Sequence, residues 1–550
     1  MMEVQLVPQP PRRLPAYRAM IVAPQPEAVE AGASILRAGG SAVDAVIACA
    51  LTQGVVDPMM CGLGGFGVLQ LHDPRTGKQI VLDGLSVSPS ASSENMWADQ
   101  FRGECPDGFG YIIRDYANEL GHRAVTVPGI LRTLGEVHSR FGRLSWPSLF
   151  EPAIAIAEEG WLVRPHVASM FHLDEAAYGR LSYRTKLAFT EDGRRLYIGA
   201  DGAPKRLGAH IRNPELADSL RLVAREGAET MYTGDLARRI VATMQQHDGL
   251  LSASDLANYR PESREPIRIN YRGYAVATPP PPAGGIIIAE ILRILERFDL
   301  PTMAHNEADY MAIVSEAMKI AGRDRDRYIG DPLFAPAPLD RLLSDDYVGS
   351  CAASIKRGER ARLPRAGSDA KDTTTISCVD SDGMMVSLTH TLGVPSGVIV
   401  PGTGFMLNGG MNTFDHRPGR AGSIAPGKRR FSTMAPTIVL RGGEPVVTLG
   451  APGGAWIAVA IAQVLINILD WGMGIQEAIA APRFSATSDA IDISNRISRA
   501  AQRDLEARGY QVRRSPVSYA FAGVHGITRW DGALDGAADP QRDGLAIGIE

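Results

Sequence analysis

Hydrophobic and polar residues recur with two different periods along the chain, and each period predicts one kind of element. Residues 17–23 form a short apolar run typical of a strand, and residues 26–40 show helical spacing that ends in two glycines. A second helix is expected from Ser41, because Asp44 stands at capping-box spacing after it. Two strands on either side of a turn follow within residues 68–85.

The pattern changes from helical to strand-like in the second part of the chain. Helical spacing dominates from about 125 to 330, and a polar stretch punctuated by Gly and Pro at 340–372 is the best linker candidate. Residues 373–380 and 384–392 then flank a Ser-Asp-Gly turn at 381–383, which predicts a β-hairpin. Further strands are predicted at 396–402, 435–443, 445–451 and 511–515, with helices at 455–472 and 495–508. This mixture indicates an α+β fold in which sheet packs on sheet with helices outside.

Length and charge narrow the classes of protein. The 550 residues can bury a large core, as two or three domains or as one large domain of packed layers. Hydrophobic residues make up 45% and charged residues 21%, an ordinary balance for a soluble globular protein. The 57 Lys and Arg residues against 61 Asp and Glu residues give a net charge of −4. We therefore expect neither nucleic acid nor an anionic membrane as the main partner.

Cysteines and apolar runs give three further expectations. Five cysteines are scattered without metal-ligand or Cys-x-x-Cys spacing, so neither a disulfide framework nor a structural zinc site is expected. No ligand cluster or phosphate loop is found, and we expect no metal and no cofactor. The N-terminal arginine pair is followed by no apolar segment, and the longest apolar run, 457–471, is too short to span a bilayer. A cytoplasmic location is the expectation.

The glycines of residues 62–67 fit the spacing G-x-G-x-x-G of dinucleotide-binding sites. That site requires a strand before the glycines and a helix after them. Here a predicted helix precedes the glycines and a predicted strand follows them. Close packing of the backbone is therefore the better interpretation of these glycines.

Three consecutive threonines, Thr373, Thr374 and Thr375, begin the predicted hairpin. Threonine forms strands readily, so an ordinary strand start is one interpretation. The other is cleavage after Asp372, which would free the α-amine of Thr373 next to its own hydroxyl. An α-amine titrates at about 7.7–8.0 and could act as the general base near neutral pH. Spacing alone leaves both interpretations open.

Strand alternation places the polar side chains of the hairpin on one face. Thr373 and Thr375 share a face, while across the hairpin Thr389 and Thr391 alternate likewise and His390 points the other way. Thr391 is thus placed to hydrogen-bond a nucleophile on the neighbouring strand. The Ser/Thr face could be exposed to solvent or form the floor of an active site.

A Pro-Gly-Gly turn at 452–454 joins a predicted strand to a predicted helix. Backbone N–H groups at such a junction point toward one spot and could hold an oxyanion. A plain tight turn is the alternative, and the turn alone does not distinguish the two.

Several segments resemble the γ-glutamyltranspeptidase family when they are taken together. Residues 373–392 resemble the start of its small subunit, and they are followed in the family's order by "PGKRRFSTMAPTIVL" and "GAPGG" at 426–440 and 450–454. Residues 31–58, 62–67, 271–285 and 316–332 resemble segments of its large subunit. The resemblance covers nearly the whole chain.

The resemblance implies an N-terminal-nucleophile hydrolase with a four-layer αββα fold that matures by self-cleavage. Cleavage after Asp372 would give a large subunit, 1–372, and a small catalytic subunit, 373–550. The two fragments would form one composite domain and a heterodimer, with a dimer of such heterodimers left open. Thr373 would be the nucleophile.

The resemblance also implies roles for five other residues. Thr391 would hydrogen-bond the nucleophile, and Gly453 and Gly454 would form the oxyanion hole. Ser432 and Thr433 match a serine pair that contacts the α-carboxylate end of the family's substrate.

Three substrate-binding positions depart from the family's pattern. Leu85 stands where the family has an arginine for the glutamyl α-carboxylate, and Gly393 stands where it has an asparagine. Thr413 replaces an aspartate that holds the α-amino group. Charged hydrogen bonds contribute about 1.5–3 kcal/mol each, so these departures matter for the substrate. We expect intact catalytic residues and an altered acyl pocket.

The sequence therefore predicts a self-processing threonine amidohydrolase or acyltransferase that acts on a small-molecule amide through an acyl-enzyme on Thr373. The acyl group is expected to be non-standard, either a small oxamate-like amide or a glutaryl group as in the related cephalosporin acylases. A genuine γ-glutamyltransferase or glutathione hydrolase is the first alternative. An uncleaved, non-enzymatic binding homologue is the alternative from another class.

Overall fold

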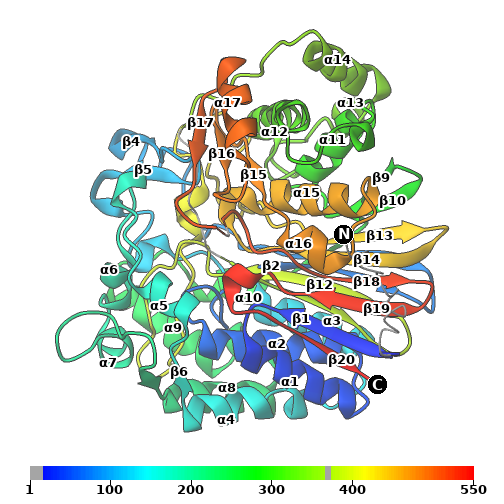
Figure 1. Cartoon of the computed structure of the whole chain (residues 1–550). Helices are drawn as coiled ribbons and strands as arrows, with labels where there is room; N and C mark the ends of the chain where they lie inside the picture. Colours follow the sequence, from blue (N-terminus) through cyan, green and yellow to red (C-terminus); the bar gives the residue numbers. More distant parts are fainter. Residues whose placement is uncertain (1–15, 366–372, 519) are drawn as a thin grey trace.

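Two antiparallel β-sheets form the centre of the fold (Figure 1). The computed structural model describes residues 16–365, 373–518 and 520–550, and Asp372 lies outside them. The first sheet has seven strands, in the order β20 (Leu545–Ile549), β1 (Ala19–Ala23), β11 (Thr374–Val379), β12 (Met385–Thr391), β2 (Phe66–Asp73), β3 (Lys78–Gly84) and β8 (Glu262–Arg264). The second has six, in the order β19 (Ala533–Ala537), β18 (His525–Trp530), β14 (Glu444–Gly450), β13 (Thr437–Arg441), β10 (Tyr274–Thr278) and β9 (Ile267–Tyr271).

The two sheets pack face to face through polar as well as apolar contacts. Ser387 on β12 donates a hydrogen bond of 3.2 Å to the carbonyl of Leu449 on β14. Gln70 on β2 donates a bond of 2.9 Å to the carbonyl of Ala277 on β10. Buried polar groups need partners, and here they find them in the facing sheet.

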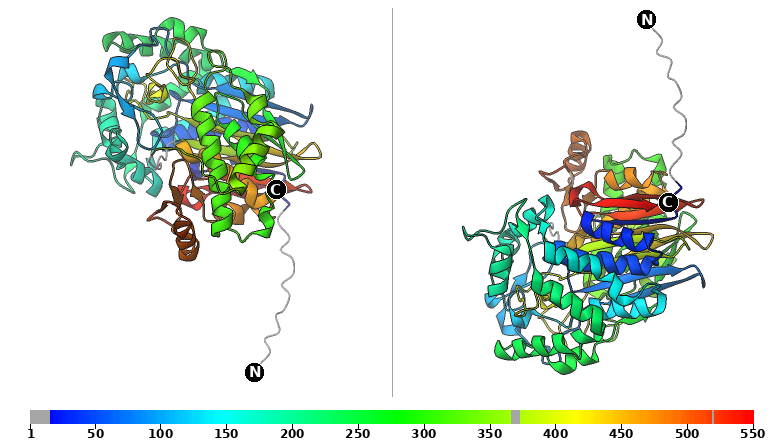
Figure 2. Two further views of the ribbon diagram at one scale, coloured as in Figure 1. Left: turned by 90° about the horizontal axis from the view of Figure 1, so that it is seen from above. Right: turned by 90° about the horizontal axis from the view of Figure 1, so that it is seen from below.

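Helices cover the outer faces of the two sheets. On the first sheet lie α1 (Pro26–Arg37), α2 (Ala42–Val56) and α3 (Ile130–Phe141), and on the second lie α11 (Gly285–Leu295) and α15 (Ile457–Leu469). Figure 2 shows green helices over the strands from above and blue helices over them from below. The predicted α+β class is confirmed.

The remaining helices surround this centre: α4 (Glu151–Glu159), α5 (Pro165–Phe171), α6 (Tyr183–Leu187), α7 (Glu191–Tyr197), α8 (Pro214–Glu226), α9 (Asp235–Gln246), α10 (Ala253–Asn258), α12 (Ala308–Tyr328), α13 (Leu339–Leu342), α14 (Asp345–Lys356), α16 (Ile475–Ala480) and α17 (Arg499–Ala507). Short strands complete it: β4 (Phe101–Glu104), β5 (Tyr111–Ile113), β6 (Trp161–Leu162), β7 (His210–Ile211), β15 (Phe484–Ser485), β16 (Ile491–Ile493) and β17 (Val512–Arg514). None of the helices in the described part of the chain is both long and apolar enough to cross a membrane.

Helix α2 is buried on nearly all sides, which explains its composition. Its capping box is formed as predicted, with Ser41 accepting from the N–H of Asp44 and Asp44 accepting from the N–H of Ser41. Apolar residues surround the helix because it lies between the first sheet and an outer helix, α4. The one glutamine near its end, Gln53, is fully buried against the β11–β12 hairpin.

The predicted hairpin is present, and it is buried on both faces. Its ladder runs from Thr374 opposite His390 to Val379 opposite Met385. Every residue of both strands is buried. The Ser/Thr face is therefore not exposed to solvent, because it packs against the second sheet.

Several regions differ from the predicted elements, and among them are the strands β18 to β20 within residues 525–549, which were not predicted. Residues 396–402 form no strand and make only an isolated bridge at Ile399, because prolines flank the segment and Gly397 adopts φ 79°. Strands β8 to β10 occupy 262–278, where helical spacing was expected to dominate. The predicted linker begins with α13 and α14 and is irregular only from Arg357 to Arg365 within the described residues.

Candidate active site

Thr373 and Thr391 lie opposite each other where β11 begins and β12 ends. Thr374 pairs with His390 as the last position of the ladder, and Thr373, which precedes β11, and Thr391, the last residue of β12, directly adjoin this pair. Both residues are buried, with 4% and 3% of their surface exposed. The Thr391 hydroxyl accepts a hydrogen bond of 2.9 Å from the N–H of Gly393, which leaves its own proton for a neighbouring oxygen.

The backbone at Thr373 is strained. Its φ is 95°, a value that is a genuine outlier for a β-branched residue. Such conformations cost about 1–3 kcal/mol and persist only where the surrounding structure imposes them. The strain thus lies at the N–Cα bond of Thr373, the residue that follows the predicted cleavage site.

The glycines that precede β2 pack closely against the end of β12, at Thr391. A Cβ atom on Gly65 would lie 2.5 Å from the carbonyl oxygen of Thr391, and one on Gly64 would lie 2.5 Å from that of Met406. Both distances are too short for any side chain. The glycines serve close backbone packing, as predicted, and they support the end of β12.

The Pro-Gly-Gly turn between β14 and α15 has a conformation that requires glycine. Gly453 and Gly454 have φ values of 135° and 52°, and a Cβ on Gly453 would lie 2.6 Å from Cα of Ala522. Thr433 donates a hydrogen bond of 2.7 Å to the carbonyl of Gly454. That bond holds the turn against the segment that carries the predicted substrate contacts.

Ser432 and Thr433 are fixed by the proline-rich loop 279–284. The N–H of Ser432 donates 2.9 Å to the carbonyl of Pro282, and the N–H of Gly284 donates 2.9 Å to the carbonyl of Met434. Both residues remain at the wall of a cavity.

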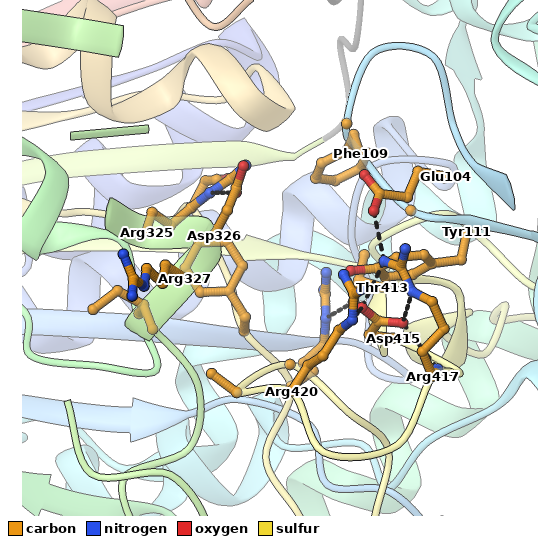
Figure 3. A pocket seen from close by; sticks show the side chains of 18 of the residues that line it. Glu104, Phe109, Tyr111, Arg325, Asp326, Arg327, Thr413, Asp415, Arg417 and Arg420 are labelled. Carbon is orange, nitrogen blue, oxygen red and sulfur yellow. Dashed lines mark hydrogen bonds and ion pairs between the residues drawn. The ribbon is translucent and has the colours of Figure 1, made fainter. Parts of the chain in front are cut away.

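That cavity has a volume of about 400 Å³ and a cationic lining. It lies between the end of α12, strands β4 and β5 and the loop 413–422, and Figure 3 shows Arg325 and Arg327 on one side with Arg417 and Arg420 on the other. Six arginines and three carboxylates line it: Arg325, Arg327, Arg365, Arg417, Arg420, Arg430, Glu104, Asp326 and Asp415. The excess of positive charge favours an anionic ligand.

Two of these arginines, Arg325 and Arg365, share one carboxylate, that of Asp326. Burial lowers the pKa of Arg325 to about 10. Burial and the nearby charge of Arg325 lower the pKa of Arg365 to about 9. Arg417, by contrast, bonds both Asp415 and Glu104, which raise its pKa. An added carboxylate would therefore be stabilised on the α12 side of the cavity.

The three altered substrate positions do not all reach this cavity. Leu85 is completely buried in the apolar core and does not line it. Thr413 lines the cavity directly. Gly393, with φ 67°, lies beside it, since a Cβ there would be 3.3 Å from Nη1 of Arg430.

Arg430 connects two of the altered positions and was missed by the sequence analysis. Its Nε donates 2.7 Å to Oγ1 of Thr413, and its guanidinium lies 4.7 Å from the ring centre of Phe66. The preceding residue, Arg429, does not line the cavity, and its guanidinium forms an ion pair of 3.2 Å with the carboxylate of Glu262. The doubled arginine within residues 426–440 was the one available signal.

The described residues contain possible metal ligands, and their cysteines are buried. No group of three or more His, Cys, Asp and Glu side chains is arranged there to hold a metal ion. The five cysteines are buried and free, and burial raises the pKa of Cys49, Cys61 and Cys378 well above the usual value. Inert, protonated thiols are expected in such surroundings.

Known proteins with similar sequence or structure fall into one family. The sequence profile of the gamma-glutamyltranspeptidase family matches residues 28–549. The acylase ACY 1 proenzyme of Pseudomonas sp. (strain SE83) is 37% identical over 544 residues, covering 97% of this chain and 94% of that protein. The glutathione hydrolase proenzyme of Pseudomonas aeruginosa is 34% identical over 553 residues, covering 96% and 94%.

A solved structure agrees with the sequence matches. The crystal structure of cephalosporin acylase from Bacillus halodurans superposes with a TM-score of 0.86 at 32% sequence identity, covering all of this chain and 99% of that one. The motif-based resemblance is thus confirmed across nearly the whole length. The chain belongs to the gamma-glutamyltranspeptidase family and is an enzyme of its hydrolase and transferase class.

Proposed function

We propose that this enzyme is a self-processing threonine amidohydrolase or acyltransferase that cleaves a small-molecule amide through an acyl-enzyme on Thr373. The burial of Thr373 and Thr391 at the same end of the β11–β12 hairpin, with Thr373 in a strained conformation, is the observation that carries this proposal. The related acylase and glutathione hydrolase are both named proenzymes, which supports maturation by cleavage.

In the proposed maturation, Oγ1 of Thr373 attacks the carbonyl carbon of Asp372. The peptide C–N bond breaks as the ester C–O bond forms, and the amine takes the hydroxyl proton. Water then hydrolyses the ester to a carboxylate on Asp372 and restores the Thr373 hydroxyl. The strained φ at Thr373 favours this step because breaking the peptide bond releases the strain.

The fragments 1–372 and 373–550 would stay together as a heterodimer and one composite domain. The first sheet alternates their strands, since β1 and β2 of the large fragment flank β11 and β12 of the small one. Separation would expose every backbone hydrogen bond between them. The helices on both outer faces support the four-layer αββα arrangement proposed from the resemblance.

In the proposed catalytic cycle, the freed α-amine of Thr373 takes the proton of its own hydroxyl. The oxygen attacks the substrate carbonyl, while Thr391 holds it by a hydrogen bond. The N–H groups of Gly453 and Gly454 stabilise the oxyanion. The leaving amine departs with the proton, and water or a second amine resolves the acyl-enzyme.

For the acyl group, we propose a carboxylated chain without an α-amino group, of the glutaryl or oxamate kind. Arg430 supports this proposal, because it brings a guanidinium to Thr413 and Gly393, where the family's aspartate and asparagine are absent. A carboxylate gains a charged partner there. Ser432 and Thr433 line the same cavity and would contact the acyl group.

The test compares three anilides on the purified, cleaved enzyme. Glutaryl-p-nitroanilide and oxalyl-p-nitroanilide, an N-aryl oxamate, should be hydrolysed with higher kcat/KM than γ-glutamyl-p-nitroanilide, because Thr413 offers no charge for an α-amino group. Preference for the γ-glutamyl compound would favour a genuine glutathione hydrolase. A chain that stays uncleaved and turns over none of the three would favour the binding homologue.

A further inference from the structure

A buried amide behind the reactive hairpin contacts both of its strands. Gln53 on α2 donates 2.9 Å from Nε2 to Oγ1 of Thr374, and its Oε1 lies 2.7 Å from Nε2 of His390. All three residues are buried, with 2% or less of their surface exposed. A single side chain thus bonds one residue of β11 and one residue of β12, and these two residues face each other in the ladder.

The direction of each hydrogen bond follows from the chemistry of the groups. Burial lowers the pKa of His390 to about 3, so its ring is neutral near pH 7. Oε1 of Gln53 only accepts, so the proton of the ring is on Nε2. The second N–H of the Gln53 amide donates 2.6 Å to Oε1 of Gln25. In one orientation, the Gln53 amide can therefore donate a hydrogen bond to Thr374 on β11 and accept one from His390 on β12 at the same time.

Two further residues fix the orientation of that amide. Gln25, which precedes α1, donates 2.7 Å from Nε2 to Oδ2 of Asp57, and Thr374 donates 3.3 Å to Oε1 of Gln25. Asp57 is fully buried at the end of α2. A flipped Gln53 amide would put two oxygens against each other at Gln25 and an N–H against the ring N–H of His390. The orientation is therefore determined by the whole chain of bonds.

The bonded residues adjoin the reactive pair. Thr374 follows Thr373, and His390 precedes Thr391. We infer that Gln53 is a positioning residue for the proposed reaction: its amide holds Thr374 and His390 together and thereby keeps Thr373 opposite Thr391. This inference rests on the proposed function for its effect on rate, but the contacts themselves do not depend on it.

The test uses Gln53→Met, which keeps the length of the side chain and removes its hydrogen bonds. Gln70→Met is the matched control, because Gln70 is also fully buried and loses a hydrogen bond of 2.9 Å to a facing strand. For the cleaved enzymes, we expect Gln53→Met to lower kcat by about tenfold to a hundredfold with KM little changed. A role in stability alone would lower the melting temperature of both variants and spare kcat.

A double mutant distinguishes the loss of the hydrogen bond between Gln53 and Thr374 from the change in side-chain packing. Thr374→Val removes only the hydroxyl, and we expect it to slow turnover as well. Because both changes break the same contact, the combination with Gln53→Met should be no slower than the slower single variant. Multiplied effects, or a kcat loss in Gln53→Met no larger than in Gln70→Met, would overturn the inference.

Amide hydrogen exchange of the uncleaved Thr373→Ala chain gives a readout without catalysis. Gln53→Met in this background should speed exchange in peptides covering 373–379 and 385–392, and Gln70→Met should not speed it at residues 373–375. Unchanged exchange would overturn the positioning role whatever the enzyme does. Faster exchange with an inactive, uncleaved wild type would instead refute the proposed function and leave the contact supported.

Discussion

Replacing Arg430 by Gln should remove recognition of the acyl carboxylate and leave the catalytic groups in place. Arg430 has only 3% of its surface exposed, so solvent screens its charge weakly. A hydrogen bond to a charged group contributes about 1.5–3 kcal/mol, and about 1.4 kcal/mol corresponds to a factor of ten. We therefore expect kcat/KM for glutaryl-p-nitroanilide to fall by roughly 10- to 150-fold.

The assay needs a substrate with the same acyl chain but without its charged end. Butyryl-p-nitroanilide lacks the carboxylate, and its kcat/KM should change by less than about threefold in Arg430→Gln. Arg420→Gln is the matched protein control, because Arg420 lines the same cavity but its side chain is 53% exposed and lies 3.7 Å from Asp415. That variant should lose little activity on either substrate.

Two results would refute the reasoning about Arg430. Equal losses on the glutaryl and butyryl substrates would mean that the substitution disturbs the site as a whole rather than a carboxylate contact. Equal losses in Arg430→Gln and Arg420→Gln would mean that the general charge of the cavity, and not the guanidinium bonded to Thr413, attracts the substrate.

Three further predictions concern the altered pocket and the buried network. Thr413→Asp should lower activity on glutaryl-p-nitroanilide, because its carboxylate would pair with Nε of Arg430, which lies 2.7 Å from the present hydroxyl. The combination of Gly393→Asn and Thr413→Asp should raise activity on γ-glutamyl-p-nitroanilide, because Thr413 lines the cavity and Gly393 lies beside Arg430; no gain in a folded, cleaved enzyme would contradict the pocket argument. Burial raises the pKa of Asp57 from 3.8 to about 7, so the folded state holds this proton more tightly than the unfolded state. Its contribution to stability is present below pH 4 and is lost as the pH rises to 7, by at most about 4 kcal/mol. Between pH 4 and 7 the melting temperature of the uncleavable Thr373→Ala chain should fall relative to that of the same chain with Asp57→Asn. Melting temperatures that change with pH in the same way in both chains would contradict the raised pKa of Asp57.

Local sequence rules predicted the parts of the fold that depend on near neighbours. The capping box at Ser41 and Asp44, the β11–β12 hairpin and the glycine turn at 452–454 each follow from residues a few positions apart. The sequence around Gly65 argued against a dinucleotide site and for close packing of the backbone, which the structure has. The sequence did not reveal that Gly65 packs against the carbonyl of Thr391.

The parts that escaped prediction depend on contacts between distant segments. Gln53 and His390 are 337 residues apart, and nothing near Gln53 indicates a polar partner. Arg430 reaches Thr413 across a loop whose path the sequence does not specify. Strands β9 and β10 were missed although residues 267–271 alternate between apolar and polar, because each strand has only five residues and both follow a long region of helical spacing.

The central claim is that the chain cleaves itself at Thr373, and intact-mass measurement of the purified protein tests it most directly. The account predicts two masses for the wild type, those of residues 1–372 and 373–550, which together equal the 59.0 kDa chain plus one water. The Thr373→Ala variant should give only the full chain. If the wild type also stays whole, Thr373 is an ordinary strand residue, and the proposed mechanism is wrong.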